Sequence, residues 1–391
     1  MKIERIELGD LALSGGMVDG PFGSDLKASE YVASGVPIIR LQNIKPGLFI
    51  QKEIQFVSEN KAKELSRHNY QPGDLVIAKL GDPCGVAAVV PKSTSPGIIV
   101  ADVVRFRGDP SRVDHFFISY FLNSPAGRRQ IDAMAKGTTR QRCNLSDLKS
   151  IKIDLPPIEE QKRIAAILNK ADSLLRKRQQ AIRLADDFLR AVFLDMFGKR
   201  GRNAALGDYV NVLSGFAFKS ENYIGNTGAR LLRGINVGIG ACEWKNTAFY
   251  PQELTQELGR YELIDGDVVL AMDRPWISDG LKCAVINKDV AGSLLVQRVA
   301  RLRAKGIPCA QFVYQCLIDA EFQRHCRVTE TTIPHISPTD LATYPIPKAS
   351  PQELERFSAI AAKATTLVRS GSDSNERIQS LALSLQSALL S

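Results

Sequence analysis

Hydrophobic and polar positions follow two different periods along the 391 residues of the chain. Short apolar runs between Gly, Pro and Asp residues are typical of strands. In the first part of the chain these runs lie at 36–41, 75–78, 86–90 and 98–104. A helical pattern follows at 113–136 and is broken by Gly137. Strands mixed with a helix in this way predict an α+β domain over 1–155.

The same order of elements returns in the second part of the chain. Its apolar runs lie at 230–237, 268–272, 284–286 and 294–302, and a helical pattern follows at 310–327. Short motifs recur with it: Leu-Gly-Asp at 8–10 returns at 206–208, and Gly-Asp-Leu-Val at 73–76 returns as Gly-Asp-Val-Val at 266–269. A period of about 195 residues is too long for a solenoid repeat and indicates two whole domains, the second at 204–348.

Each domain is followed by a segment with a heptad pattern. At 156–198 two prolines and two glutamates favour a helix start, and apolar residues then step by four and three from Ile164 to Met196 with one defect at Arg178. At 350–391 a capping box of Ser350 and Glu353 opens a similar pattern whose centre is polar and small.

Sustained heptads predict that these two helices pair as a long antiparallel coiled coil, giving the molecule pseudo-two-fold symmetry. That register places Arg178 opposite Ser374. The alternative is that each helix packs only on its own domain, although globular helices usually carry a wider apolar stripe.

Charge and cysteine content narrow the class of protein. The net charge is +9, from 51 Lys and Arg against 42 Asp and Glu, which fits either an ordinary basic protein or one whose excess charge faces phosphates. The seven cysteines form no C-x2-C pair, so we expect no metal site and no disulfide framework. No apolar run reaches membrane-spanning length and the start lacks the pattern of a signal peptide, so a cytoplasmic protein is expected.

No motif in the chain indicates catalysis. The sequence Asp-Arg-Pro-Trp at 273–276 differs from the Asp/Asn-Pro-Pro-aromatic loop of amino-methyltransferases in its arginine, and no F-x-G-x-G cofactor loop precedes it. There is no phosphate-binding G-x4-G-K-[ST] loop, and the four histidines stand apart from any nucleophile motif. The sequence therefore predicts a non-catalytic chain without a cofactor.

The junction between the first domain and its helix carries the most specific motifs. A Gly-Thr-Thr-Arg-Gln-Arg loop at 137–142 leads into Asn-Leu-Ser-Asp-Leu at 144–148, and Pro-Pro-Ile-Glu-Glu-Gln at 156–161 opens the helix. Together with the two-domain, two-helix layout, these motifs resemble the central region of type I restriction-modification specificity subunits. The second junction departs from the pattern, because 331–337 lacks the arginines and 351–355 lacks the Glu-Gln pair.

The resemblance implies that each domain is a target recognition domain that reads one half of a split site in double-stranded DNA. It also implies that the paired helices set the gap and bind methyltransferase subunits, and through them a restriction and translocation subunit. The expected partner contacts on the first helix are Glu160, Gln161 and Arg163. A helix from 164 to 196 spans about 50 Å, or roughly 15 base pairs.

Candidate DNA contacts fall into groups by the chemistry of their side chains. Arginine forks suit guanine, amides suit adenine and carboxylates suit cytosine, whereas isolated cations bind phosphates. The candidates for base edges are Arg140, Arg142, Gln141, Asn144, Asp82 and Asp273, and those for phosphates are Lys79, Arg128, Arg129, Lys219 and Arg324. Further candidates in the same loops are Thr139, Arg274, Thr332, His335 and Trp276. For each arginine the alternative is a solvated surface side chain, and Trp276 fits base stacking or a core position equally well.

Two other functions fit the sequence. One is a structural adaptor whose coiled coil and domains bind proteins, although the basic charge and the arginine-rich loop favour DNA. The other is a regulatory decoy with the same fold.

Overall fold

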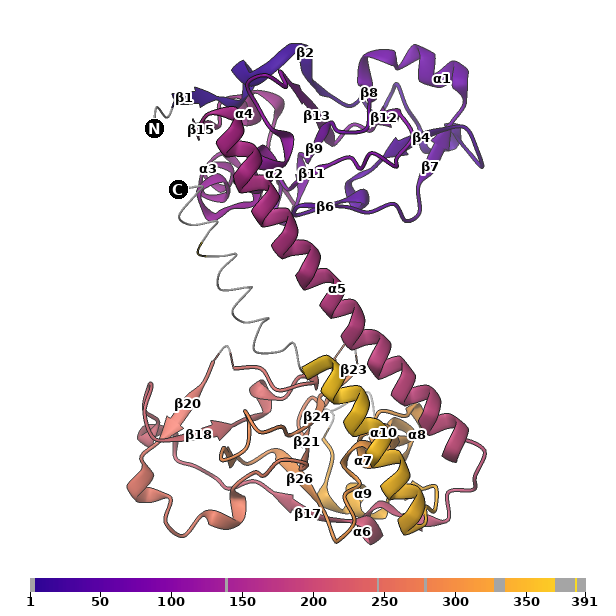
Figure 1. The fold of residues 1–391 in the computed structure, drawn as a ribbon, viewed down its shortest axis with the longest axis vertical. Coiled ribbons are helices and arrows are strands. Elements are labelled where there is room, and N and C mark those ends of the chain that lie inside the picture. The colour runs from indigo at the N-terminus through magenta and orange to yellow at the C-terminus, as the bar shows by residue number, and fades with distance from the viewer. Residues whose placement is uncertain are drawn as a thin grey trace. The chain divides into compact units, whose positions relative to one another are not determined.

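The computed structural model describes residues 4–137, 140–244, 246–277, 280–326 and 335–369, together with Ser384. These residues form two compact units, one ending at Arg178 and including Ser384, and one beginning at Gln179. The border falls inside the long helix α5, Ile158–Phe197, so each unit contains one half of this helix (Figure 1). No helix of the described residues is long and apolar enough to cross a membrane.

Unit 1 contains two main sheets. The strand order of the first is β11-β9-β13-β2, with β2 Ala12–Asp19, β9 Leu75–Ala78, β11 Ala87–Val89 and β13 Val103–Gly108. The order of the second is β3-β7-β4-β12-β8, with β3 Tyr31–Val32, β4 Val36–Ile39, β7 Gln55–Val57, β8 Asn69–Tyr70 and β12 Gly97–Ile99. Three short pairs complete it, with β1 Glu4–Glu7 on β15 Lys152–Leu155, β5 Ile44–Lys45 on β6 Leu48–Phe49, and β10 Leu80–Gly81 on β14 Gln141–Arg142.

Strand β9 is the centre of unit 1, because all four of its residues are buried. Leu75 and Ile77 face a core that also contains Ile164 of α5, while Val76 and Ala78 face a separate core toward the second sheet. The period of two in a strand sends successive side chains to opposite faces, so this strand needs apolar residues at every position. The helices are α1 Glu59–Glu64, α2 His115–Asn123, α3 Pro125–Met134 and α4 Leu145–Lys149.

The single helix predicted at 113–136 is wrong, since the structure has two helices there. Ser124 accepts a hydrogen bond from the amide of Gly127 and so caps α3, and Pro125 occupies its first turn. A proline lacks the N–H that a continuing helix requires, which ends α2 at this point.

Unit 2 repeats the plan of unit 1. Its five-stranded sheet has the order β17-β26-β21-β24-β19, with β17 Val210–Ser214, β19 Ile239–Gly240, β21 Val268–Ala271, β24 Cys283–Val285 and β26 Val299–Ala304. A three-stranded sheet has the order β20-β18-β25, with β18 Ala229–Leu232, β20 Ala248–Tyr250 and β25 Leu294–Leu295. Two short pairs are β16 Ala204–Ala205 on β27 Pro345–Ile346, and β22 Trp276–Ile277 on β23 Gly280–Leu281.

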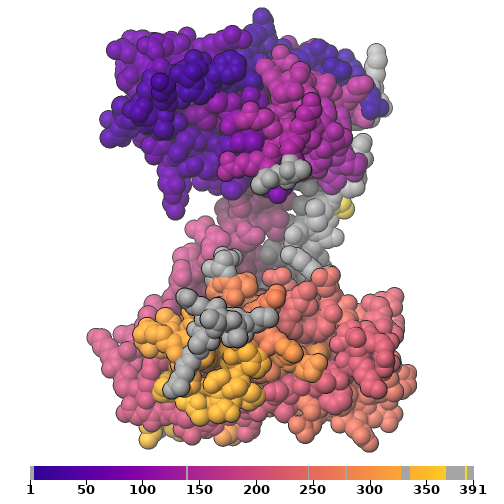
Figure 2. Space-filling view, turned by 180° about the vertical axis from the view of Figure 1, so that it is seen from behind, coloured from indigo at the N-terminus to yellow at the C-terminus, as the bar shows by residue number. Residues whose placement is uncertain are grey.

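The helices of unit 2 gather on one side of it. They are α6 Leu206–Tyr209, α7 Ala310–Leu317, α8 Ala320–His325, α9 Pro338–Thr343 and α10 Pro351–Arg369. Figures 1 and 2 show the orange and yellow segments with α7 to α10 on one side of the unit and the salmon segments with β18 and β20 on the other.

An ion pair between a buried aspartate and a partly exposed arginine occurs at the same place in both copies. Asp74 accepts bonds from Nε and Nη2 of Arg107 at 2.8 and 2.7 Å, and Asp267 accepts the same two bonds from Arg303 at 2.8 Å each. Each carboxylate also accepts the amide of the residue three positions earlier, which closes the Gly-Asp turn before β9 and β21. The repeated sequence motif thus corresponds to a repeated structural joint.

The second half of α5 packs antiparallel on α10, as the coiled-coil prediction requires. Leu189 packs against Ala361 and Ala364. The rings of Phe193 and Phe197, which come later in α5, have their centroids about 6 Å from that of Phe357, which comes earlier in α10. The predicted heptad positions 192 and 196 are only half buried, and Phe193 and Phe197 are buried instead, because here the helix also packs on the globular core. Ser374, the predicted partner of Arg178, lies outside the described residues.

Candidate nucleic-acid interface

The ends of β9 and β21 form equivalent corners in the two units. In unit 1 the amide of Lys79 donates to the carbonyl of Asp102, and the amide of Cys143 donates to the carbonyl of Lys79. In unit 2 the amide of Met272 donates to the carbonyl of Arg298, and the amide of Ile336 donates to the carbonyl of Met272. Asp102 of unit 1 is therefore equivalent to Arg298 of unit 2. Arg142 precedes Cys143 and His335 precedes Ile336, so Arg142 and His335 are equivalent as well.

The corner of unit 1, formed by Asp19, Lys79, Asp102 and Arg142, contains two ion pairs. Nη2 of Arg142 lies 2.8 Å from Oδ1 of Asp102, and more than half of the arginine side chain is exposed. Nζ of Lys79 lies 2.7 Å from Oδ2 of Asp19, but only a tenth of the lysine side chain is exposed. Arg142 is thus positioned to reach a ligand, while the ammonium of Lys79 neutralises a neighbouring carboxylate.

The corner of unit 2, formed by Asp273, Arg274, Arg298 and His335, is organised by one carboxylate. Oδ1 of Asp273 lies 2.6 Å from Nδ1 of His335, and Oδ2 accepts a hydrogen bond from Nη1 of Arg298. Burial opposes ionisation of Asp273, but the bonds from Arg298 and His335 outweigh it and lower its pKa. The carboxylate is therefore charged at neutral pH and holds two basic side chains.

A cavity of about 640 Å³ opens at this corner of unit 2. It is lined by Gly234, Ile235, Asp273, Arg274, Lys282, Gln297, Arg298 and His335. Burial lowers the pKa of Lys282, whose ammonium donates to the carbonyl of Gly234. Three of the sequence-predicted residues, Asp273, Arg274 and His335, thus come together around one hollow rich in donors.

The arginine-rich loop of unit 1 lies beside β10. Gln141 and Arg142 form β14, which pairs with Leu80 and Gly81, while Arg140 and Asp82 are exposed. Asn144 caps α4, since its Oδ1 accepts the amide of Asp147 at 2.9 Å.

The remaining predicted DNA contacts differ in how much of the side chain is accessible. Arg128 donates to the carbonyl of Cys84 at 2.6 Å and pairs with Asp132, whereas Arg129 is exposed. Lys219 and Arg324 are exposed as well, and each lies near a glutamate. Trp276 is half buried and packs on the core at 6.1 Å from Phe322. Thr139 and Thr332 lie outside the described residues.

The start of α5 corrects one of the expected partner contacts. Gln161 is fully buried, and its amide bonds the N–H of Asp114 and the carbonyls of Arg112 and Pro156 at 2.8 to 2.9 Å. It anchors the helix to unit 1 and presents no surface to a partner. Glu160 and Arg163 do lie at the surface, joined by two hydrogen bonds of 2.7 and 2.8 Å.

The sequence analysis missed two charged residues of these corners, Asp102 and Arg298. Each directly precedes a long central strand, β13 or β26, in a stretch without a recognisable motif. An alignment of the two copies on their Gly-Asp turns, at positions 73 and 266, would have paired Asp102 with Leu295, so only the backbone bonds of the folded units show that Asp102 and Arg298 are equivalent.

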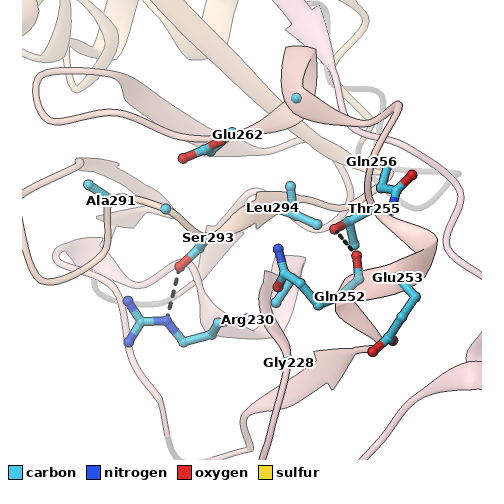
Figure 3. Close-up of a pocket in the computed structure, with 13 residues that line it drawn as sticks. Gly228, Arg230, Gln252, Glu253, Thr255, Gln256, Glu262, Ala291, Ser293 and Leu294 are labelled. Carbon is cyan, nitrogen blue, oxygen red and sulfur yellow. Dashed lines mark hydrogen bonds between the residues drawn. The ribbon is translucent and has the colours of Figure 1, made fainter.

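A second cavity of unit 2, of about 690 Å³, lies over the three-stranded sheet (Figure 3). Its one basic side chain is Arg230, which donates to Ser293 at 3.0 Å and stacks on Trp244 at 4.2 Å. The other polar side chains of its lining are Gln252, Glu253, Thr255, Gln256 and Glu262. Arg230 is half buried between Ser293 and Trp244, so this cavity has no basic side chain as exposed as Arg298 at the Asp273 corner.

Comparison with known proteins finds similarity to one family along most of the chain. Residues 5–184 match the model of the type I restriction modification DNA specificity domain. The MjaVIII specificity subunit of Methanocaldococcus jannaschii is 24% identical over 315 residues, which cover 75% of this chain and 73% of that protein. The EcoAI specificity subunit of Escherichia coli is 41% identical over 98 residues, which cover 25% of this chain and 16% of that one.

Residues 5–184 therefore belong to the family of type I restriction modification DNA specificity domains, and three quarters of the chain is similar to a type I specificity subunit. The fold agrees with this assignment. The crystal structure of the S subunit from M. genitalium matches 99% of this chain and 95% of its own with a TM-score of 0.65, at 14% identity. The predicted α+β class and the long helix are therefore confirmed. No cluster of three or more potential metal ligands occurs among the residues that the structure describes.

Proposed function

We propose that each unit of this specificity subunit reads one half of a bipartite DNA site through the charged corner at the end of its central strand. The observation that carries the proposal is the recurrence of this corner at equivalent positions of both units, with an exposed arginine in each. An arginine fork donates two hydrogen bonds to O6 and N7 of guanine, which is the commonest specific contact in the major groove. Exposed cations away from the corners, such as Arg129 and Lys219, would bind phosphates and set the orientation.

The proposal assigns α5 two roles, spacing the half-sites and binding methyltransferase subunits. A continuous helix of 40 residues spans about 60 Å, enough to separate two readers by more than one turn of DNA. Leu174, Leu184 and Phe188 are each about half exposed on this helix. Large apolar side chains that are exposed on a helix surface are typical of a protein interface. Glu160 and Arg163 would add polar contacts near the start of the helix.

Catalysis in this proposal belongs to the partner subunits. The chain supplies DNA contacts but none of the nucleophile, cofactor or metal motifs that methyl transfer or strand cleavage requires. The purified chain should therefore neither methylate nor cleave DNA, and should direct methylation to its site once methyltransferase subunits are added. Transfer of a labelled methyl group by the isolated chain would overturn this assignment.

The direct test is selection of duplexes from a randomised library by the complex of this chain with its methyltransferase subunits. The expected product is two short defined blocks separated by a fixed undefined gap, bound with an affinity that falls steeply as salt rises. One heptad inserted in α5, with a matching heptad in the C-terminal helix, should lengthen the gap by about 3 base pairs, since seven residues add about 10 Å. Selection without sequence preference, or a gap that stays the same, would contradict the proposal.

A further inference from the structure

We propose that Arg298 determines the base preference of the half-site read by unit 2, by recognising a guanine, and that Asp273 is the residue that positions it. This inference rests on the proposed function and adds a specific reader and a specific base to it. It comes from the cavity at the Asp273 corner, from the backbone at that corner, and from the comparison with unit 1.

The backbone at the corner holds Arg298 in a rare conformation. The described residues include three non-glycine residues with positive φ, and two of them, Arg274 at 44° and Arg298 at 66°, line the same cavity. Side chains avoid this region unless the surrounding structure imposes it, and such residues concentrate where a ligand is bound. The carbonyl of Arg298 accepts the amide of Met272, which fixes its turn against the end of β21.

The side chain of Arg298 is held in one orientation by Asp273 and is still accessible to a ligand. About two thirds of it is exposed, while Nη1 is held by the carboxylate of Asp273, of which only a quarter is exposed. The edge formed by Nε and Nη2 is then the one that can donate two parallel bonds to the O6 and N7 atoms of guanine. The second bond of Asp273, to His335, keeps the carboxylate from turning with the arginine.

Unit 1 has an acidic residue at the position that Arg298 occupies in unit 2. There Asp102 occupies the place of Arg298 and holds Arg142, which comes from the returning segment. Each corner therefore contains an exposed arginine that is paired with a less exposed aspartate. The two arginines belong to different segments, since Arg142 lies in β14 and Arg298 directly precedes β26. The difference in origin predicts that the guanines they read occupy different places in the two half-sites.

The test compares variants of the full chain in complex with its methyltransferase subunits, using library selection and the binding of single duplexes. Arg298→Ala should lower discrimination at one G·C pair of the second half-site by about 10- to 100-fold and leave the first half-site unchanged. Arg298→Lys should keep most of the affinity but lose the discrimination, because lysine lacks the fork. Asp273→Asn, which preserves the shape of the side chain but removes the charge that holds Nη1 of Arg298, should relax the same base pair and leave the first half-site unchanged.

Arg324→Ala is the matched control, because this arginine of unit 2 is exposed to the same extent and is also paired with a carboxylate. It should alter affinity for all duplexes equally or not at all. A uniform loss with Arg298→Ala would make it a phosphate contact, and a change confined to the first half-site, or no change, would equally overturn the inference. These outcomes differ from failure of the proposed function, in which the unmodified complex itself selects no sequence.

Discussion

The two units share their scaffold and differ in the charges that the scaffold presents. Both have an ion pair that closes the turn before the central strand, and we call it the joint: buried Asp74 with Arg107 in unit 1 and buried Asp267 with Arg303 in unit 2. At the end of that strand, only a few residues away, Leu80 of unit 1 corresponds to Asp273 of unit 2. A single framework can thus carry different readers, because the fold depends on the joint while base recognition depends on the exposed corner.

The first way to test this comparison is to remove the shared joint, where we expect the largest effect. Asp74→Ala and Asp267→Ala should each destabilise their own unit by about 3–5 kcal/mol, because each buried carboxylate accepts three hydrogen bonds, two from its arginine and one from the turn amide, and these donors lose their acceptor. Hydrogen exchange in β9 and in β21 would measure the two effects separately.

Asp265→Ala provides the control, since Asp265 is exposed in the same turn as Asp267 and its loss should change little. Loss of stability in only one unit would show that the joint is equivalent in geometry but not in energy. The shared scaffold would then be the wrong basis for comparing the units.

The second test concerns the anchoring of the long helices, where a buried amide in unit 1 corresponds to a buried leucine in unit 2. Gln161 and Leu354 precede the equivalent core residues Ile164 and Phe357 by three positions, and both are at most 5% exposed. Gln161→Leu should cost about 2–3 kcal/mol because it leaves the amide of Asp114 and two carbonyls unsatisfied.

Leu354→Gln should cost a similar amount for the opposite reason, since it introduces an amide into an apolar site. Chemical unfolding followed by hydrogen exchange in α2 and α7 would assign each loss to its unit. A Gln161→Leu variant as stable as the wild type would show that the helix start is held by apolar contacts alone.

The sequence allowed the repeat, the central strands of each unit, the helix α5 and the start of α10 to be predicted, since these depend on local periodicity. It did not reveal the end of α2 at Ser124, where a cap and a proline outweigh the apolar pattern of the flanking residues. The shift of the buried face from the heptad positions to Phe193 and Phe197 depends on α7 and α10, which no local pattern reports.

The candidate site was predictable only in part. Asp273 and His335 were chosen for their chemistry and do come together, although they lie 62 positions apart in the sequence. Arg298 was missed because its role follows from a partner 25 positions away and from the backbone conformation at the corner. Lys79 and Gln161 have suitable chemistry but are buried, and burial of a single polar residue depends on tertiary packing.

The third test uses the corners themselves. Arg142→Ala should reduce discrimination in the first half-site by about 1–3 kcal/mol without affecting the second, which is the reverse of the pattern expected for Arg298→Ala. Arg140→Ala, in the same loop and also exposed, should likewise affect only the first half-site. Selection experiments on the three variants would measure this directly, and a variant that changed both half-sites would contradict separate reading.

The smallest expected effect distinguishes the two helix starts by pH. A hydrogen bond from Arg200, followed by bonds from the amide and hydroxyl of Ser350, lowers the pKa of Glu353 from 4.5 to about 2. At the start of α5, the bond from Arg163 lowers the pKa of Glu160 as well, but no serine cap adds to it. A carboxylate with a depressed folded-state pKa stabilises the fold fully above its unfolded pKa, and this contribution is lost as the pH falls through the folded value.

The start of α10 should therefore remain intact at pH 5 and loosen between about pH 4.5 and 2 as Glu353 takes up a proton. Titration of the Glu353 carboxyl and of the Ser350 amide by NMR would follow the change, and Glu353→Gln should make the amide signal independent of pH in this range. Glu160→Gln should leave the Ser350 titration unaltered. A Glu353 titration midpoint near 4.5 would mean that neither Arg200 nor Ser350 holds the carboxylate in solution.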